Sequence, residues 1–357
     1  MHKKLFIPGP TEVKKEVLEA QTEWMIGHRT KEFSELLERV TEKIKKALNT
    51  KANVFIFTSS ATGVMEGTIR NVVKTKYLGT VCGAFSSRWY KIGVESGKEG
   101  DKIEVEWGKA IKPEMIEEKL KSGKYDTLLL TYNETSTGVM NPLADIGEVM
   151  KKYPDVIFAV DAVSAMMGAP IKFEEWGIDV IFASVQKCFA LPPGLTVALV
   201  SDKALERAKT VEGRGYYFDF IEMAKRYNEK RQTTATPAIS LIYALDKQMD
   251  RILEEGIENR YRRHQEMAEY TQKWAMERGF EMFPEKGYWS PTVSTIKNTK
   301  GYSVADLNKE LGKRGLMISN GYGKLKEITF RIGHMGDHTL DDVKEVLEAI
   351  DEIWNLK

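Results

Sequence analysis

Short apolar runs alternate with longer amphipathic ones through the middle of the chain. Glycine, proline, asparagine or charged residues bound each apolar run, as expected for strands buried in a parallel sheet. Helical spacing of apolar residues fills the gaps between them. This alternation predicts an α/β domain with helices on both faces of a mostly parallel sheet. The seven expected strands are residues 53–58, 80–83, 102–106, 127–131, 156–161, 179–184 and 196–201.

The pattern changes on both sides of this block. Two helices are expected before it, at residues 14–22 and 31–47. After it we expect a smaller α+β unit with a long helix, a strand, a helix, a strand and a helix at residues 241–278, 293–296, 304–314, 328–332 and 340–355. The expected organisation is an N-terminal segment, a large domain and a small C-terminal domain at residues 1–15, 16–245 and 246–357.

Composition narrows the possible partners. The 357 residues are 42% hydrophobic and 29% charged with a net charge of +1, so no basic excess attracts nucleic acid or anionic membranes. No apolar run predicts a membrane span and no secretory signal opens the chain, so we expect a cytoplasmic protein. Two cysteines, Cys82 and Cys188, are too few for a disulfide framework, and the histidines lack the spacing of a metal site. No metal is expected.

Candidate chemistry begins where a predicted strand turns into a helix, since ligands bind at the carboxyl ends of strands in an open α/β sheet. Ser60, Ala61 and Thr62 follow the strand at residues 53–58. Free backbone N–H groups and the helix dipole favour an anion such as phosphate at this position. The same residue types suit an ordinary helix cap. Alone, the turn leaves both interpretations open.

A carboxylate and an amine follow two further strands. Asp161 ends an apolar strand, where a buried carboxylate needs a cationic or hydrogen-bonding partner; a helix cap is the alternative. Lys187 lies between an apolar strand and an apolar loop, where desolvation lowers the pKa of an amine, as a Schiff-base lysine requires. A lysine that reaches back to solvent is the alternative. Together, the phosphate turn, Asp161 and Lys187 indicate a pyridoxal 5′-phosphate (PLP) enzyme, with Asp161 beside the pyridine nitrogen and Lys187 holding the cofactor.

At these residues the sequence resembles the class V aminotransferases, in particular the alanine–glyoxylate and serine–glyoxylate (serine–pyruvate) branch. The resemblance runs from PGPT at residues 8–11 to RIG at 331–333, and it is strongest at ETSTG (134–138), VDAVS (160–164), SVQK (184–187) and PPG (192–194). It implies the aspartate aminotransferase-like fold of PLP-dependent transferases, with a large domain around a seven-stranded sheet and a smaller C-terminal domain.

The resemblance also implies contacts around the cofactor ring. Gln186 and Ser136 are expected to flank the ring near its 3′-oxygen, Val163 to contact one face, and Trp89 to stack on the ring. Lys187 and Asp161 keep the roles given above, and they are the expected catalytic residues.

At the phosphate end, Ser60, Ala61 and Thr62 match the family's phosphate loop. The family often has glycine where this chain has Ala61, and some members have histidine in place of Thr62, which puts the side-chain contacts in doubt. A threonine of the dimer partner completes this site in the family. Here Thr234 and Thr236 both fit, so the resemblance implies a homodimer with active sites at its interface and leaves the choice between them open.

For the substrate, the resemblance implies that Arg331 binds the α-carboxylate and that Gly9 belongs to the substrate site. We expect ping-pong transamination between alanine or serine and glyoxylate or pyruvate. Phosphoserine or aspartate with 2-oxoglutarate is the alternative, because His28 and Arg29 resemble a pair that meets the substrate phosphate in phosphoserine aminotransferases.

Sequence features argue against two other classes of PLP-fold protein. A cysteine desulfurase needs a nucleophilic cysteine on a C-terminal mobile loop, and neither Cys82 nor Cys188 lies there. An inert PLP-fold protein would not need the intact pair of Asp161 and Lys187.

Overall fold

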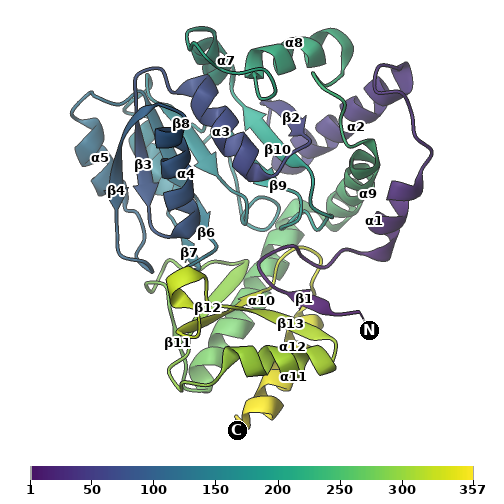
Figure 1. Ribbon diagram of the computed structural model, residues 1–357, viewed down its shortest axis with the longest axis vertical. Helices are drawn as coiled ribbons and strands as arrows, with labels where there is room; N and C mark the ends of the chain where they lie inside the picture. Colours follow the sequence, from purple (N-terminus) through teal and green to yellow (C-terminus); the bar gives the residue numbers. More distant parts are fainter. Residues whose placement is uncertain (1, 357) are drawn as a thin grey trace.

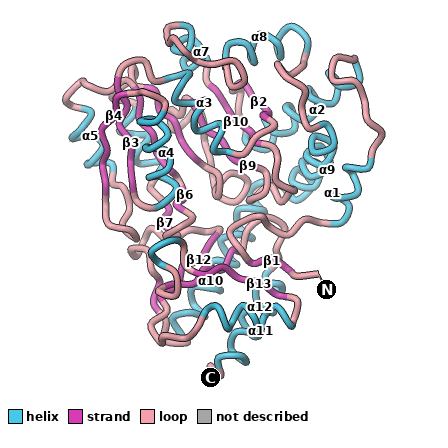
Figure 2. The backbone as a smooth tube through the Cα atoms, in the orientation of Figure 1, coloured by secondary structure: helices cyan, strands magenta, loops and turns pink. Residues whose placement is uncertain are grey.

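The computed structural model describes residues 2–356, which form two large β-sheets of unequal size and a short two-stranded sheet (Figure 1, Figure 2). The larger sheet has seven strands, in the order β2 (Asn53–Phe57), β10 (Thr196–Val200), β9 (Val180–Ser184), β8 (Ile157–Asp161), β5 (Thr127–Thr131), β3 (Lys76–Val81) and β4 (Glu99–Glu104). Strand β10 runs antiparallel to both of its neighbours, and the other pairs are parallel. The expected α/β fold with a mostly parallel seven-stranded sheet is confirmed.

Alternate residues of each strand pack against helices on opposite faces of this sheet. In β8, Phe158 and Val160 join the core on one face, and Ile157 and Ala159 join the core on the other. The first face is covered by α2 (Lys31–Leu48), α5 (Pro113–Leu120), α6 (Leu143–Met150) and α9 (Ile239–Glu255). The second is covered by α3 (Ala61–Val72), α4 (Ala84–Glu95), α7 (Asp202–Lys209) and α8 (Phe220–Lys230).

Two strands of the large sheet begin earlier than the apolar pattern predicts. Strand β3 starts at Lys76 and contains Gly79, which weakens the strand signal in the sequence. A Cβ at this position would lie 2.9 Å from the Tyr90 ring, so close packing explains the glycine. Strand β4 forms an edge of the sheet and is mostly polar. Apolar runs therefore locate the start of the other five strands better than the start of β3 and β4.

The smaller sheet has five strands, in the order β1 (Lys4–Phe6), β13 (Leu316–Asn320), β14 (Thr329–Gly333), β12 (Val293–Lys297) and β11 (Glu281–Met282). It packs with α10 (Ile257–Glu277), α11 (Val304–Lys313) and α12 (Leu340–Trp354) around its own core. Strand β1 pairs parallel with β13, so the N-terminal segment is joined to the sheet of the C-terminal unit, below the large sheet in Figure 1. The remaining elements are α1 (Lys15–Glu19), η1 (Ala20–Thr22), β6 (Asn133–Glu134), β7 (Val139–Met140) and η2 (Gly323–Leu325).

The single helix predicted at residues 241–278 is wrong. The chain forms two helices there, α9 and α10, separated by Gly256 with φ +79°. A residue in this conformation ends a helix, and glycine adopts it without steric cost. The expected domain division after residue 245 falls within α9 and stays a prediction. Within residues 2–356, no helix is both long enough and apolar enough to cross a membrane.

Candidate active site

A cavity of about 150 Å³ lies where β2, β8 and β9 end, beside the first turns of α3 and α4. These carboxyl ends gather side chains from segments far apart in the sequence, as expected for an open α/β sheet. The predicted residues that line the cavity are Ser60, Ala61, Thr62, Asp161, Val163, Gln186 and Lys187.

Asp161 is the last residue of β8, and it is buried. Its Oδ1 accepts a hydrogen bond from the Val163 N–H at 2.9 Å, and no other protein donor within residues 2–356 reaches the carboxylate. Burial raises the pKa of Asp161 to about 7, opposed in part by that hydrogen bond. A cationic partner in the cavity would favour the charged carboxylate again. A protonated pyridine nitrogen is such a partner.

Lys187 lies three residues beyond β9, in the loop that leads to β10. Its carbonyl accepts a hydrogen bond from Thr11 Oγ1 at 3.1 Å, and its Nζ donates to the carbonyl of Pro8. Burial lowers the pKa of Lys187 to about 8, and the nearby charge of Arg331 acts in the same direction. The amine is therefore closer to its nucleophilic, neutral form at physiological pH than an exposed lysine.

Gly9 lies directly against this amine. It has φ +101°, and a Cβ there would lie 2.5 Å from Lys187 Cδ and 2.8 Å from Nζ. Backbone conformation and available space both require glycine. The N-terminal loop thus packs on the lysine side chain, while contact between Gly9 and a substrate stays a prediction.

The turn before α3 offers a limited cradle for an anion. The N–H of Ala61 already donates to Ser184 Oγ at 2.7 Å. The N–H groups of Ser60 and Thr62 have no acceptor within residues 2–356, and the Ser60 side chain caps no helix N–H. Those two donors and the positive end of the helix dipole fit a phosphate group.

Two side-chain oxygen atoms of residues that line the cavity are buried and lack a hydrogen-bond donor within residues 2–356. They are Gln186 Oε1 and Asn133 Oδ1. An unsatisfied buried acceptor costs about 1–3 kcal/mol, so each atom fits a ligand that carries a donor. A hydroxyl on the cofactor ring would supply one such donor.

The structure corrects the expectation for Trp89. Its side chain is 1% exposed, its Nε1 donates to the Met65 carbonyl at 3.1 Å, and it packs edge-on against Phe182 in the core. Trp89 does not line the cavity, whereas Phe85 does. Residue 85 is in the first turn of α4, at the strand ends, and residue 89 lies one turn further along, over the sheet.

Ser136 is also placed outside the cavity, which corrects its expected contact with the ring. Asn133 and Thr135 line the cavity, while Glu134 and Ser136 accept hydrogen bonds from backbone N–H groups at the start of α4. Ser136 Oγ donates to Glu134 Oε1 at 2.6 Å. Glu134 also accepts from the N–H of Ser86 at 2.9 Å, and this buried carboxylate anchors the helix that carries Phe85.

Arg331 extends from β14 and is 7% exposed. Its Nε donates to the Asn320 carbonyl at 3.1 Å and its Nη1 to the Thr135 carbonyl at 3.2 Å. No carboxylate within residues 2–356 lies at ion-pair distance from it, and burial lowers its pKa to about 10. Tyr322 lies beneath the guanidinium, with the Cζ atom 5.5 Å from the ring centroid.

Arg331 does not line the cavity itself but contacts Thr135, which does, whereas Arg88 lines the cavity directly. The sequence pattern did not single out Arg88. It lines the cavity, its Nη2 donates to Tyr322 Oη at 3.2 Å, and its guanidinium lies over the Phe85 ring at 4.9 Å. Arg88 lies one helical turn after Phe85 in the FSSRW segment, so the helical spacing of these two residues could have predicted that both line the cavity.

Four further predicted residues, His28, Arg29, Thr234 and Thr236, lie together outside the cavity of their own chain. Arg29 donates to the carbonyls of Thr233 and Thr234, and His28 Nε2 lies 3.4 Å from Thr236 Oγ1. These side chains form a separate cluster near the loop that precedes α9. Within one chain, Arg29 therefore shapes the turn at Thr234, and its contact with a substrate stays a prediction.

Comparisons with known proteins agree with this geometry. The family model described as aminotransferase class-V matches residues 5–334. An uncharacterised aminotransferase of Methanocaldococcus jannaschii is 40% identical over 355 residues, covering 98% of this chain and 91% of that protein. The serine–glyoxylate aminotransferase of Methylorubrum extorquens is 34% identical, covering 93% and 86%. The crystal structure of an alanine–glyoxylate aminotransferase from Nostoc sp. superposes with a TM-score of 0.93 at 26% identity, covering 99% and 96%.

Proposed function

Since the chain belongs to the class V aminotransferases, and is therefore a PLP-dependent transaminase, we propose that its substrates are small. The donor is alanine or serine, the acceptor is glyoxylate or pyruvate, and the two half-reactions follow each other in a ping-pong sequence. The serine–glyoxylate aminotransferase of M. extorquens supports this substrate class. The observation that carries the site assignment is one cavity lined by both Asp161 and Lys187.

Lys187 and Asp161 have separate roles in the proposed reaction. When bound, the cofactor supplies an electron sink for the charge left at the substrate Cα after proton removal. Lys187 Nζ holds the cofactor and then moves the proton from Cα, a task that a lowered pKa favours. Asp161 keeps the ring nitrogen protonated, and its burial strengthens that pairing.

Arg331 binds the substrate carboxylate. Two of its nitrogens are fixed by backbone carbonyls, which holds the guanidinium plane in place before substrate arrives. A fixed carboxylate orients the Cα–H bond toward Lys187 and reduces the entropy lost on reaching the transition state.

We assign the assembly as a homodimer in which the partner completes the phosphate site. Thr234, Thr236 and His28 gather outside the cavity of their own chain, as expected for residues that serve the partner subunit. Exposed Trp24, at 89%, and Tyr216, at 76%, lie in the chain segments around this cluster and provide apolar surface for an interface. Sedimentation equilibrium tests this: twice the mass of one chain supports the assignment, and a monomer contradicts it.

A donor with a second acidic group is the alternative substrate class. Arg88 lines the cavity, and no carboxylate within residues 2–356 lies at ion-pair distance from it. It could pair with the side chain of aspartate or phosphoserine. The cysteine desulfurase alternative is disfavoured, because Cys82 and Cys188 are both buried and burial raises the pKa of each thiol to about 12.

The test is a matrix of donors and acceptors on the PLP-loaded protein, repeated with Arg88→Gln. The proposal expects the highest kcat/KM with serine or alanine and glyoxylate or pyruvate, and a small effect of R88Q on these pairs. Highest kcat/KM with aspartate or phosphoserine and 2-oxoglutarate, lost selectively in R88Q, would refute the small-substrate proposal.

A further inference from the structure

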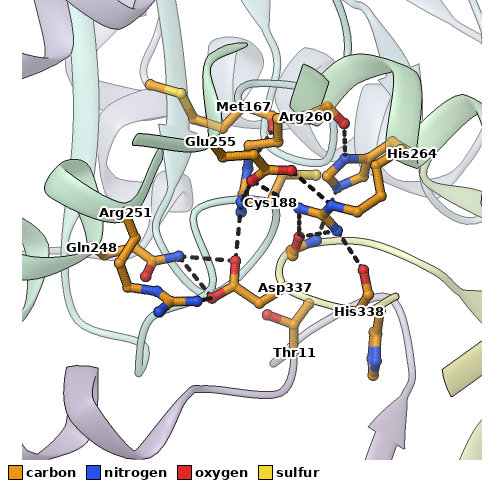
Figure 3. Close-up of polar contacts among 12 residues, drawn as sticks. Thr11, Met167, Cys188, Gln248, Arg251, Glu255, Arg260, His264, Asp337 and His338 are labelled. Atoms are coloured by element: carbon orange, nitrogen blue, oxygen red, sulfur yellow. Dashed lines mark hydrogen bonds and ion pairs between the residues drawn. The ribbon is translucent and has the colours of Figure 1, made fainter. Parts of the chain in front are cut away.

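Arg260, on α10, is the centre of a buried network of charges outside the cavity (Figure 3). The residue is 1% exposed. Its Nη1 contacts Glu255 at 2.8 Å and Asp337 at 3.0 Å, so two carboxylates balance its charge. Its Nε donates to the Met167 carbonyl at 3.1 Å and its Nη2 to the Cys188 carbonyl at 2.7 Å. Burying a charge costs several kcal/mol. Here each of the three guanidinium nitrogens has at least one hydrogen-bond or ion-pair partner, which offsets that cost.

The two carbonyls belong to the loops that follow the two strands of the site. Cys188 directly follows Lys187, and Met167 lies in the turn that follows Asp161. Met167 has φ +68°, a left-handed conformation that costs a non-glycine residue about 1–3 kcal/mol. The loops are in close contact, because a Cβ on Gly168 would lie 2.6 Å from Cys188 Sγ. Arg260 therefore fastens the lysine loop to the turn after the carboxylate.

The other side of the network holds the loop after β14, the strand that carries Arg331. Asp337 lies in this loop, and its pKa is lowered by the charge of Arg260 against the opposing effect of burial. One turn along α10, His264 Nε2 accepts a hydrogen bond from the Gly336 N–H at 3.0 Å. A Cβ on Gly336 would lie 3.4 Å from the Lys187 carbonyl oxygen. The same helix thus fixes the lysine loop and the arginine strand relative to each other.

We propose that Arg260 is a positioning residue that fixes Lys187 Nζ relative to Asp161 and Arg331, acting through the Cys188 and Met167 carbonyls. Arg260 does not line the cavity, so it contacts neither cofactor nor substrate. The inference rests on the proposed role of Lys187. A small displacement of that amine is enough to slow proton transfer, since a misplacement of about 1 Å costs about 100-fold in rate.

The test compares Arg260→Lys with Arg278→Lys. R260K keeps a positive charge beside Glu255 and Asp337, but one ammonium group cannot bind two carboxylates and two carbonyls as a planar guanidinium does. Arg278 is the matched control, because it lies at the C-terminal end of the same helix and pairs with the carboxylate of Asp351 at 2.8 Å. Its side-chain hydrogen bonds all go to Asp351 and none to the lysine loop or to the loop after β14.

Two measurements are made on each variant. With substrates, R260K is expected to lose about 10- to 100-fold in kcat with little change in KM. In cofactor-free protein, the rate of bond formation with added PLP is followed against pH by visible absorbance. Its midpoint in R260K is expected to move upward, because a displaced Lys187 amine is better solvated. R278K is expected to keep the wild-type kcat and midpoint.

The outcomes separate this inference from the proposed function. R260K with a wild-type kcat and midpoint overturns the inference, and so does an equal change in R278K, which would indicate a general structural effect. A wild-type protein in which PLP forms no bond at Lys187 overturns the proposed function itself. If R260K does not fold, the double variant R260M/D337N removes the positive charge of Arg260 together with one of its counter-charges. A lowered kcat and a raised midpoint in this variant support the inference, and wild-type values overturn it.

Discussion

Replacing Lys187 by methionine is expected to stabilise the cofactor-free protein at neutral pH while abolishing activity. Burial lowers the pKa of Lys187 from 10.5 to about 8. At about 1.36 kcal/mol per unit, the difference of 2.5 units corresponds to about 3 kcal/mol of lost folding free energy. The residue is only partly buried and borders the cavity, so solvent reduces this to about 1–3 kcal/mol. Methionine has a similar length and no charge to desolvate.

The direction of the stability change with pH follows from the two pKa values of Lys187 in the folded and unfolded protein. The unfolded amine keeps its proton up to pH 10.5, and the folded amine keeps it only up to about pH 8. The cost to the folded state is therefore complete below pH 8 and disappears as the pH rises toward 10.5. Methionine also loses the hydrogen bond to the Pro8 carbonyl, a loss of about 1 kcal/mol that offsets part of this gain.

Urea unfolding of the cofactor-free wild-type and K187M proteins, followed by tryptophan fluorescence at pH 7 and pH 10, measures this difference. Groups that both proteins share cancel in the comparison. We expect the stability of K187M relative to wild type to be higher at pH 7 than at pH 10. The same difference at both pH values would refute the claim that Lys187 is a desolvated amine.

Four further substitutions test the site. Asp161→Asn is expected to lower kcat by about 100- to 1,000-fold in steady-state assays, because the amide cannot stabilise a protonated ring nitrogen; an unchanged kcat contradicts that role. Arg331→Lys is expected to raise the KM of the amino donor by about 10- to 100-fold, since the planar fork is lost; a change in kcat alone argues against carboxylate binding. Gly9→Ala would bring a Cβ to 2.5 Å from Lys187 Cδ, so PLP binding, measured by visible absorbance, is expected to slow about 10-fold or more. Gly97→Ala is its control, with φ +73° and nothing within 4 Å, and equal slowing there would indicate a general backbone effect. Phe85→Leu is expected to weaken PLP affinity in equilibrium titrations by about 3- to 10-fold through lost stacking, and unchanged affinity would exclude that contact.

The parts of the site that the sequence predicts well are those fixed by strand ends. Asp161 ends one largely apolar strand and Lys187 comes three residues after another, so their placement at one edge of the sheet follows from the parallel pairing of β8 and β9. The Ser60 turn is identified for the same reason. These positions depend on local pattern and sheet topology, both of which are visible in the chain.

Contacts that depend on tertiary packing are not visible in the same way. Phe85 and Trp89 are one helical turn apart, and only the register of α4 on the sheet decides which aromatic reaches the cavity. Thr135 and Ser136 are neighbours in the turn between β6 and β7, and the conformation of that turn decides which of the two side chains lines the cavity. Arg260 lies in a charge-rich helical stretch that resembles a solvated surface, and its burial depends on carbonyls of distant loops.

The most direct test of the central claim is borohydride reduction of the PLP-loaded protein, followed by peptide mass mapping. Reduction fixes the cofactor on the lysine that carries it. We expect the phosphopyridoxyl adduct on Lys187 and no adduct in Lys187→Ala. An adduct on another lysine of the wild-type chain, or none at all, would contradict the assignment of the site.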